Sequence, residues 1–418
     1  MKTKAAVLAG KKNIYIKEFD LPAISDDELL VKVISNSICL STYKAAIRGE
    51  EHKRVPNDIS VNPVITGHEF AGIIEQVGNN LKGQFKSGDK FVLQPAMGLE
   101  SGYSAGYSYP YFGGNATYCI IPKIAIDKGC VLHYGGNYFA NASLAEPISC
   151  IIGAFKSSYH TEPYIYEHKM GIKPGGNLAL LGCAGPMGLG AIEYAINGPI
   201  NPKLVVVVDI NQERLERAKS LITVEHSKSR GINLIYLNPG SSDATQELLS
   251  LTAGKGFDDV FVFAPVKPLI ELADDILGND GCLNFFAGPT EKKFKVPFDF
   301  YNVHYESTHI VGTSGGSTQD MVESIAMSSK GELHPSYMVT HIGGLNSAPE
   351  TILNLPNIPG GKKLIYPHID IDLFAIDELN KRSNENELFF SLAEICIRNN
   401  NVWTAEAEQY LLKYFNVL

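Results

Sequence analysis

With 418 residues, of which 44% are hydrophobic and 19% charged, the chain is long enough for two domains that each bury a core. Its formal net charge of −9, without a long run of Lys or Arg, argues against nucleic acid or an anionic membrane as a partner. The first ten residues have too short an apolar run for a signal peptide, and no later stretch reaches the roughly 18 apolar residues of a membrane span, which predicts a cytoplasmic protein.

Residues 4–94 predict a compact, mostly β domain. Short apolar or alternating runs follow one another, and Gly, Asn and Asp close them as turn residues do. Residues 71–77, for example, end at Gly78-Asn79-Asn80, and residues 86–90 turn the chain into Phe91-Val92-Leu93.

Residues 94–116 are a mixture of Gly, Ser and Tyr without a period, which predicts a long irregular lobe. Its tyrosines have two interpretations. Either their hydroxyls line a substrate cleft, or the lobe packs on itself at the surface. Residues 113–122 then return to strand.

The period of the apolar residues changes after Glu146. Residues 148–160 have apolar positions at helical spacing. From residue 171 onward strands and helices alternate, which is typical of a parallel sheet covered on both faces. Residues 177–181 and 204–208 are the first two candidate strands of that sheet.

The turn between these two strands has the features of a nucleotide site. Glycines let the backbone approach a pyrophosphate, and the following helix, residues 189–196, offers unpaired N–H groups at its start. Asp209 stands 21 positions after Gly188, where an acidic side chain accepts from ribose hydroxyls and repels the 2′-phosphate of NADP. NAD(H) is therefore favoured over NADP(H). The predicted cofactor-binding residues of the turn are Gly182, Cys183, Gly185, Pro186, Met187 and Gly188.

One residue of this turn departs from the strict glycine pattern. Position 183 would be Gly, and it is Cys183. The order of strand, turn, helix, strand and Asp supports the nucleotide interpretation, and a crossover that binds no phosphate is the alternative.

The remaining segments complete the sheet and return to the first domain. The further strand candidates are residues 258–264, 282–288 and 308–312. A helix over residues 318–329 and a strand over residues 337–341 would rejoin the β domain, so the parallel-sheet domain is an insertion. The tail predicts two helices, residues 384–398 and 404–415, which cap the first domain or, alternatively, form a subunit contact.

The seven cysteines are dispersed, which argues against a disulfide framework and for a reducing compartment. No Cys-x-x-Cys is present, so a structural zinc site of four cysteines is excluded.

Four residues of the first domain have the ligand chemistry of a catalytic metal site. Cys39, His68, Glu69 and Glu146 supply a thiolate, an imidazole and carboxylates, which suit zinc. Three protein ligands would leave one position open for water or substrate. Each residue alone is weak support, because a lone Cys is usually a small buried apolar side chain.

The order of these parts resembles a zinc-dependent member of the medium-chain dehydrogenase/reductase superfamily, over about residues 3–367. The segments that carry the resemblance are residues 37–41, 67–72, 87–92 and 145–147, the turn Gly185-Pro186-Met187-Gly188 with Asp209, and Gly361-Lys362-Lys363-Leu364. Glu146 stands where classical alcohol dehydrogenases place a second zinc cysteine, so the chain is more similar to polyol dehydrogenases. The Tyr-rich lobe and the tail resemble the L-sorbose 1-phosphate reductase branch.

This resemblance implies an α/β fold with two domains and an extension. A GroES-like β catalytic domain would cover residues 1–155 and 316–368. A doubly wound, Rossmann-type parallel sheet would cover residues 156–315, and a helical extension residues 369–418. The family also implies a homo-oligomer, either a dimer or a tetramer.

The resemblance also implies roles for single residues. Cys39 and His68 would bind one catalytic zinc, because the cysteines of the family's structural zinc are missing from the lobe. Glu69 would be a third ligand or a carboxylate beside the ligands, and Glu146 would bind the metal directly or through its water. Ser41 matches the hydroxyl that relays a proton to the substrate oxygen, and Lys44 replaces a proton-accepting His, so Ser41, Lys44 and Glu69 are the predicted catalytic residues. Asp209, Arg214 and Gly288 would contact the cofactor.

The expected reaction is hydride transfer between NAD(H) and a sugar alcohol or ketose, in particular between L-sorbose 1-phosphate and D-glucitol 6-phosphate. The alternatives are an unphosphorylated polyol dehydrogenase, a zinc-free quinone or enoyl reductase, and a non-enzymatic nucleotide-binding regulator. Lys44, Arg48, Lys53 and Arg54 would bind the substrate phosphate, or they form a solvated basic face.

Overall fold

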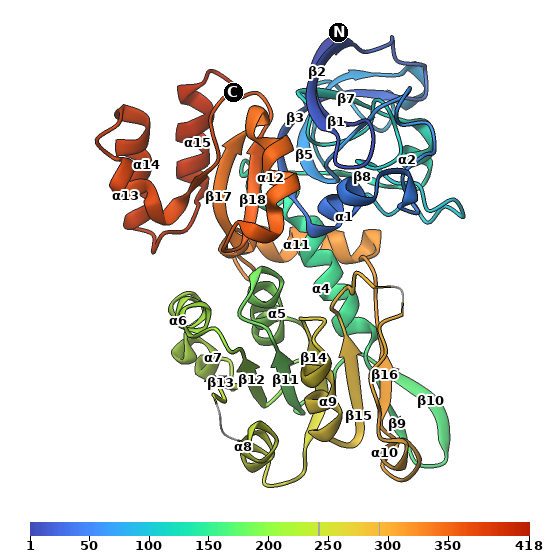
Figure 1. Cartoon of the computed structure of the whole chain (residues 1–418), viewed down its shortest axis with the longest axis vertical. Coiled ribbons are helices and arrows are strands. Elements are labelled where there is room, and N and C mark those ends of the chain that lie inside the picture. Colours follow the sequence, from blue (N-terminus) through green and yellow to red (C-terminus); the bar gives the residue numbers. More distant parts are fainter. Residues whose placement is uncertain (241–242, 292) are drawn as a thin grey trace. The chain divides into compact units, whose positions relative to one another are not determined.

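The computed structural model describes residues 1–240, 243–291 and 293–418, and the chain forms two compact units (Figure 1). The terminal unit consists of Met1–Glu146, Ser317–Ser329 and Pro335–Leu418. The inserted unit consists of Pro147–Gly316 and Lys330–His334. The boundary between the two units falls in the first turn of helix α4 (Ala145–Ser157), and the boundary predicted from the sequence falls after residue 155 of the same helix.

The main sheet of the terminal unit brings together strands from both ends of the chain. Its order is β19-β17-β18-β3-β5-β6-β8, and β7 also pairs with β3. These strands are β3 (Leu29–Ile38), β5 (Glu69–Val77), β6 (Lys90–Leu93), β7 (Tyr118–Ile121), β8 (Val131–His133), β17 (Val339–Gly344), β18 (Lys362–Tyr366) and β19 (Phe374–Ala375). A smaller antiparallel sheet has the order β2-β1-β4, formed by Ile14–Asp20, Lys2–Leu8 and Val64–Ile65.

The register of β3 with its two neighbours decides which residues meet at one edge of the main sheet. β5 and β18 both run antiparallel to β3, with Ser37 opposite Glu69 and Ile38 opposite Lys363. The end of β3 therefore lies beside the beginnings of β5 and β18. Cys39 follows this end of β3 directly.

The lobe of residues 94–116 contains no regular element, as predicted, and it is anchored in the core. Phe112 is buried and packs edge-on against Phe70, with ring centroids 6.2 Å apart. Gly106 has a positive φ of 73°, and a Cβ there would lie 2.2 Å from the carbonyl oxygen of Gly67. Only glycine fits this approach, which holds the lobe against the turn before His68.

The inserted unit is built on a parallel sheet, as the alternation of strands and helices predicts. The strand order is β13-β12-β11-β14-β15-β16, with every neighbouring pair parallel. In this order the strands are Asn233–Leu237, Leu204–Val208, Asn177–Leu181, Phe257–Val262, Leu277–Phe285 and His309–Val311. All five residues of β12 are buried, which fits a strand covered on both faces.

Helices follow most of these strands. They are α5 (Pro186–Asn197), α6 (Gln212–Leu221), α7 (Val224–Ser229), α8 (Ala244–Leu251), α9 (Lys267–Asp275) and α10 (Phe300–Tyr305). In the terminal unit the helices are α1 (Leu40–Arg48), α2 (Lys123–Asp127), α3 (Phe139–Ser143), α11 (Thr318–Ser329), α12 (Ala348–Asn354), α13 (Leu379–Arg382), α14 (Glu387–Ile397) and α15 (Ala405–Tyr414). Among the residues that the structure describes, none of these helices is long and apolar enough to cross a bilayer.

The helix of residues 318–329 and the two helices of the tail are confirmed, and Asn386 and Thr404 cap the tail helices with their side chains. The sequence does not predict helix α1, because its nine residues lack a capping side chain and the residues that it buries, Thr42, Ala45 and Ala46, are small. The strand predicted from residue 337 begins at Val339, because Pro335–Met338 forms a 3-10 turn.

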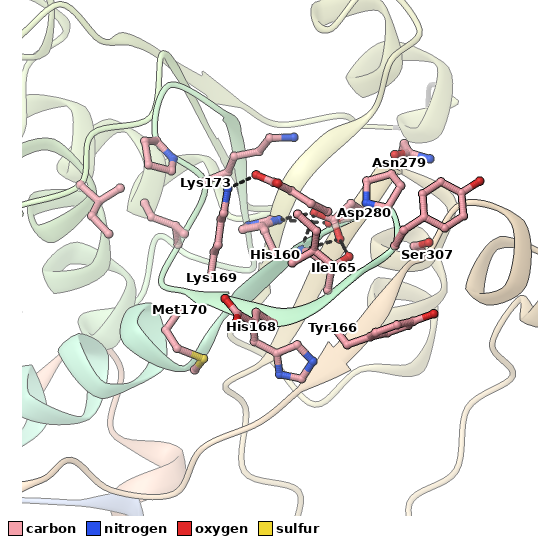
Figure 2. A pocket seen from close by; sticks show the side chains of 18 residues that line it. His160, Ile165, Tyr166, His168, Lys169, Met170, Lys173, Asn279, Asp280 and Ser307 are labelled. Carbon is pink, nitrogen blue, oxygen red and sulfur yellow. Dashed lines mark hydrogen bonds and ion pairs between the residues drawn. The ribbon is translucent and has the colours of Figure 1, made fainter.

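The hairpin of β9 (Tyr159–Glu162) and β10 (Ile165–Met170) was also not predicted, because every residue of β10 is exposed and no apolar alternation marks it. Together with residues 172–174, 279–280 and 307 it lines a pocket of about 830 Å³ (Figure 2). None of the described residues that line this pocket is a predicted site residue.

Buried ionic contacts hold the base of this hairpin. His160 lies between two carboxylates, with Nε2 3.2 Å from Asp259 Oδ2 and Nδ1 3.3 Å from Asp280 Oδ2. Figure 2 shows the second of these contacts, between His160 and Asp280. The backbone N–H and the hydroxyl of Thr161 both donate to Asp280. Burial alone would lower the pKa of His160, but the hydrogen bond to Asp259 and the charges of both carboxylates outweigh it, so the pKa is raised.

We predict that His160→Asn destabilises the protein more at pH 5.5 than at pH 8.5. A histidine whose pKa is higher in the folded state adds stability below its unfolded pKa of about 6.5, and this stability is lost as the pH rises through the folded value. Thermal unfolding of the wild type and of His160→Asn at the two pH values measures the effect. The decrease in Tm caused by the substitution should be larger at pH 5.5 than at pH 8.5 by about 2 °C or more.

His168→Asn is the matched control, because His168 lies exposed on the same hairpin, where it stacks on Tyr159. An equal decrease in Tm for His160→Asn at both pH values would show that the His160 imidazole is not charged in the folded protein.

Candidate metal centre and cofactor turn

Three predicted ligands meet at the shared edge of β3, β5 and β18. Cys39 follows β3, His68 ends the turn after β4, and Glu69 is the first residue of β5. One ligand atom from each of the three lies within 4.8 Å of the others. His68 is 4% exposed and Glu69 is fully buried. Within the described chain they are the group whose chemistry and spacing suit a metal ion.

Lys362, the first residue of β18, forms a buried ion pair with Glu69. Its Nζ donates to both carboxylate oxygens, at 2.5 and 2.7 Å. Burial would raise the pKa of Glu69, but the charges of Lys362 and His68 and the hydrogen bonds from Lys362 and Ser37 together outweigh it and lower this pKa, so the carboxylate is ionised. In the sequence, Lys362 stands within one of the segments that carry the family resemblance, but the sequence predicts no role for it. Lys362 is recognisable only once the pairing of β18 with β3 is known.

Glu146 is in the first turn of α4 and is 9% exposed. Its pKa is raised, first by burial and then by the negative charge of Glu69. It is also in electrostatic contact with Cys39 and His68, although it is not in the group of three within 4.8 Å. Glu146 therefore belongs to the same polar centre.

The charges of this centre fit a divalent cation. Burial and the charge of Glu69 raise the pKa of the Cys39 thiol, so a thiolate there needs a further positive charge. A thiolate with the carboxylates of Glu69 and Glu146 would carry three negative charges against the one positive charge of Lys362. A bound zinc ion would balance the excess, and its binding would release the thiol proton.

Hydrogen bonds orient the side chains around Cys39 and His68. Ser41 donates to Cys39 Sγ at 3.0 Å and lies 3.4 Å from His68 Nε2. Thr42 Oγ1 lies 3.3 Å from His68 Nδ1. This contact leaves Nε2 to face Ser41 and Cys39. Partners of this kind fix the orientation of a metal-binding imidazole.

Tyr107, a residue of the lobe, completes this arrangement and was not singled out from the sequence. It is 1% exposed, and its hydroxyl donates to Ser41 Oγ at 2.7 Å. Its ring lies 4.9 Å from the His68 ring, measured between centroids. The sequence shows several tyrosines in the lobe, but no pattern in an irregular segment indicates which of them points inward.

Four basic residues gather next to this centre. The half-buried His52 has its pKa lowered to about 4, first by burial and then by the charges of Arg54, Arg48, Lys53 and Lys44. Lys44, on α1, also lies within electrostatic reach of Cys39, and burial lowers its pKa. The guanidinium of Arg54 lies 5.2 Å from the centroid of the Tyr107 ring.

The turn after β11 has the geometry that a nucleotide-binding turn requires. Gly182 has a φ of 65°, Gly185 caps α5 and Pro186 begins it. A Cβ on Gly188 would lie 1.7 Å from the carbonyl oxygen of Cys183, so the helix packs on the turn through a bare backbone. The Cys183 side chain is fully buried, with Sγ 3.5 Å from the carbonyl oxygen of Gly188, so the cysteine is accommodated in the core.

The other predicted cofactor residues lie at or near the carboxyl ends of parallel strands. Asp209 follows β12 and accepts from the N–H of Ala184 in the turn and from the N–H of Asn211, both at 2.9 Å. Arg214 is in the first turn of α6 and Gly288 follows β15. Ligands of such sheets bind at this edge.

Comparison with known families agrees with both units. Residues 25–132 match the alcohol dehydrogenase GroES-like domain and residues 186–330 match the zinc-binding dehydrogenase family. These matches, with the thiol, imidazole and carboxylates described above, define a zinc-dependent oxidoreductase that uses a nicotinamide cofactor. The chain belongs to the zinc-type polyol dehydrogenases of the medium-chain dehydrogenase/reductase superfamily, so the predicted family, fold class and enzyme class are confirmed.

Among the relatives that match almost the whole chain are two that are named for an activity. Mannitol-1-phosphate 5-dehydrogenase of Aliivibrio fischeri is 64% identical over 416 residues, which are 99% of this chain and 98% of the relative. L-sorbose 1-phosphate reductase of Klebsiella pneumoniae is 44% identical over 413 residues, with the same two coverages. The solved structure of 2R,3R-butanediol dehydrogenase from Bacillus subtilis has a TM-score of 0.72 at 21% identity and shows the same fold. The match covers 87% of this chain and 99% of the butanediol dehydrogenase chain.

We predict that Cys39→Ser lowers the zinc affinity of the protein by more than about 100-fold, because contacts outside the ligand shell alone carry 10- to 100-fold. Zinc content after dialysis against a chelator, measured with turnover, tests this prediction. Cys130→Ser is the control, because Cys130, which directly precedes β8, is buried in a hydrophobic core of the terminal unit. Retention of zinc by Cys39→Ser would remove Cys39 from the ligand set.

We predict that Tyr107→Phe lowers kcat about fivefold with little change in KM. The substitution removes the hydrogen bond that orients Ser41, and one such bond contributes about 1 kcal/mol. Steady-state kinetics measure the split between kcat and KM. Tyr111→Phe is the control, because Tyr111 lies exposed in the same lobe, and both constants should stay unchanged in this variant. An unchanged kcat in Tyr107→Phe would show that Tyr107 contributes only packing.

Proposed function

We propose that this protein transfers hydride between NAD(H) and a phosphorylated hexitol or its ketose. The observation that carries the proposal is the gathering of four basic residues beside the metal centre. They follow Cys39 within one stretch of the chain, and all four lie within electrostatic reach of the half-buried His52. The His52 ring stacks on Tyr107 with the ring centroids 5.9 Å apart, which places the cluster beside the centre. A patch of cations around a neutral imidazole suits a phosphate.

A pocket of about 440 Å³ adjoins this basic cluster within the terminal unit. It is lined by Lys53, Arg54 and residues 96–104, which include Glu100. The Arg54 guanidinium and the His68 ring lie 5.2 and 4.9 Å from the same point, the centroid of Tyr107. A substrate whose reacting carbon is at the metal centre therefore has cations within reach of a phosphate on its chain.

The relatives support the phosphorylated class. Two of the relatives that match the chain end to end are named for sugar phosphates, mannitol 1-phosphate at 64% identity and L-sorbose 1-phosphate at 44%. Both hexitol phosphates are candidates, and the L-sorbose 1-phosphate/D-glucitol 6-phosphate pair expected from the sequence is one of them. The four zinc-type donors argue against a zinc-free quinone or enoyl reductase.

We assign the following roles to the residues of the centre. Cys39 and His68 would hold zinc, with Glu69 and Glu146 as a further ligand or as carboxylates beside it. When bound, zinc supplies a Lewis acid toward the substrate oxygen, and the nicotinamide supplies the hydride. Ser41 would exchange a proton with that oxygen, since Tyr107 holds its hydroxyl in place. Lys44 would act as the proton source beyond Ser41.

The cofactor is proposed to be NAD(H). The Asp209 carboxylate is already fixed toward the turn by two backbone N–H groups, so a 2′-phosphate on the adenosine ribose would meet a negative charge. Arg214, in the first turn of the next helix, would contact the same ribose.

We expect kcat/KM at least about 100-fold higher with D-mannitol 1-phosphate or D-glucitol 6-phosphate than with the free hexitols. A charge-assisted contact to phosphate contributes about 1.5–3 kcal/mol, and the cluster offers more than one. NAD⁺ reduction with the four compounds, and NADH oxidation with L-sorbose 1-phosphate and L-sorbose, measure the preference. Equal kcat/KM values for the free and the phosphorylated substrates would contradict the proposal and indicate a dehydrogenase of unphosphorylated polyols.

The same assay locates the phosphate. Arg54→Gln and Arg48→Gln should raise KM for the preferred sugar phosphate about tenfold or more, and leave turnover of the free hexitol unchanged. Lys82→Gln, an exposed lysine of the same unit, is the control. Unchanged KM in both arginine variants would place the phosphate elsewhere.

A further inference from the structure

We propose that the C-terminal extension, residues 369–418, is a positioning part of the metal centre, with Glu408 as its key side chain. The three segments that carry the centre inside the terminal unit are β3, which leads to Cys39, α3, which leads to Glu146, and β18, which begins with Lys362. The extension contacts all three. This inference concerns how the centre is held, so it does not depend on which substrate the enzyme uses.

Glu408, on α15, links α3 to β18. Its side chain is fully buried, and its two carboxylate oxygens accept from the backbone N–H groups of Phe139 and Ala140, at 2.6 and 2.7 Å. The hydroxyl of Tyr366, the last residue of β18, donates to it at 2.8 Å. A buried carboxylate persists only where hydrogen bonds replace its hydration, and burial still raises the pKa of Glu408 to about 7.

Trp403 reinforces the same connection from the loop before α15. It is fully buried, and its indole N–H donates to the Tyr366 hydroxyl at 2.8 Å. Its carbonyl oxygen accepts from the hydroxyl of Tyr138, the residue that precedes α3. Tyr366 thus accepts from Trp403 and donates to Glu408, so the end of β18 and the beginning of α3 share one hydrogen-bond network with the extension.

The third contact reaches β3. The Nζ of Lys32 donates to the carbonyl oxygen of Val417, at 2.7 Å. Ser35, also on β3, donates to the carbonyl oxygen of Phe139 at 2.6 Å, so α3 is bound to β3 as well. The strand that leads to Cys39 and the segment that leads to Glu146 are therefore bound to each other, and the extension is hydrogen-bonded to both.

The extension lies beyond the segments that the family models match, residues 25–132 and 186–330. Mannitol-1-phosphate 5-dehydrogenase and L-sorbose 1-phosphate reductase are each matched over 98% of their length by 99% of this chain. The similarity to both relatives therefore includes almost all of the extension.

Glu408→Gln tests the proposal, because Gln keeps the volume but has one acceptor oxygen for donors that now use two. We expect zinc dissociation, followed by chelator competition well below Tm, to be about tenfold faster than in the wild type, and kcat to fall about fivefold or more. KM for NAD⁺ should not change. Glu406→Gln is the matched control, since Glu406 lies exposed in the same turn of α15 and pairs with Arg398.

Two results would overturn the proposal. The first is that Glu408→Gln has a lower Tm but the same zinc dissociation rate and kcat as Glu406→Gln, which would make Glu408 a purely structural residue. The second is a folded Tyr366→Phe variant with an unchanged zinc dissociation rate. Tyr366→Phe removes the shared hydroxyl and little volume, so it tests the proposal even if Glu408→Gln does not fold. Because zinc release needs no substrate, neither result depends on the proposed hexitol phosphate.

Discussion

The buried ion pair of Lys362 and Glu69 is the constraint on which the metal centre depends. Removing each charge from water costs several kcal/mol, and breaking such a pair by removing one partner costs about 3–5 kcal/mol. The pair persists because the two strand beginnings that carry it flank β3 on either side. It also fixes a carboxylate beside Cys39 and His68, and leaves an excess of negative charge that a divalent cation would balance.

The sequence predicts the inserted unit well, because its signals are local. The valine-rich β12, the glycine turn and Asp209 follow one another within a few dozen residues, and each has a physical reason for its place. The ligand types at Cys39, His68 and Glu69 are also readable, since few residues suit zinc. The predicted roles of these side chains stay predictions, but the structure brings their atoms together.

What the sequence does not predict depends on pairing between distant segments. Lys362 becomes a partner of Glu69 only through the register of β18, and Tyr107 reaches Ser41 only because Gly106 packs against Gly67. The tail helices are visible in the apolar spacing, whereas the hydrogen bonds of Glu408 to α3 are not. In each case the residue type is ordinary and its neighbours decide its role.

The discontinuity of the terminal unit imposes an order on its maturation during synthesis. Glu69 and Lys362 are 293 positions apart, so at 5–20 residues per second a ribosome needs roughly 15–60 s to deliver the partner of the carboxylate. The inserted unit, almost all of it one continuous segment, emerges complete within that interval. A nascent chain therefore contains a complete parallel-sheet domain at a time when Cys39, His68 and Glu69 still lack β18 and the tail. Premature termination would release a folded parallel-sheet unit attached to an incomplete main sheet that lacks β18. Chaperones and proteases would recognise the exposed edge of such a sheet.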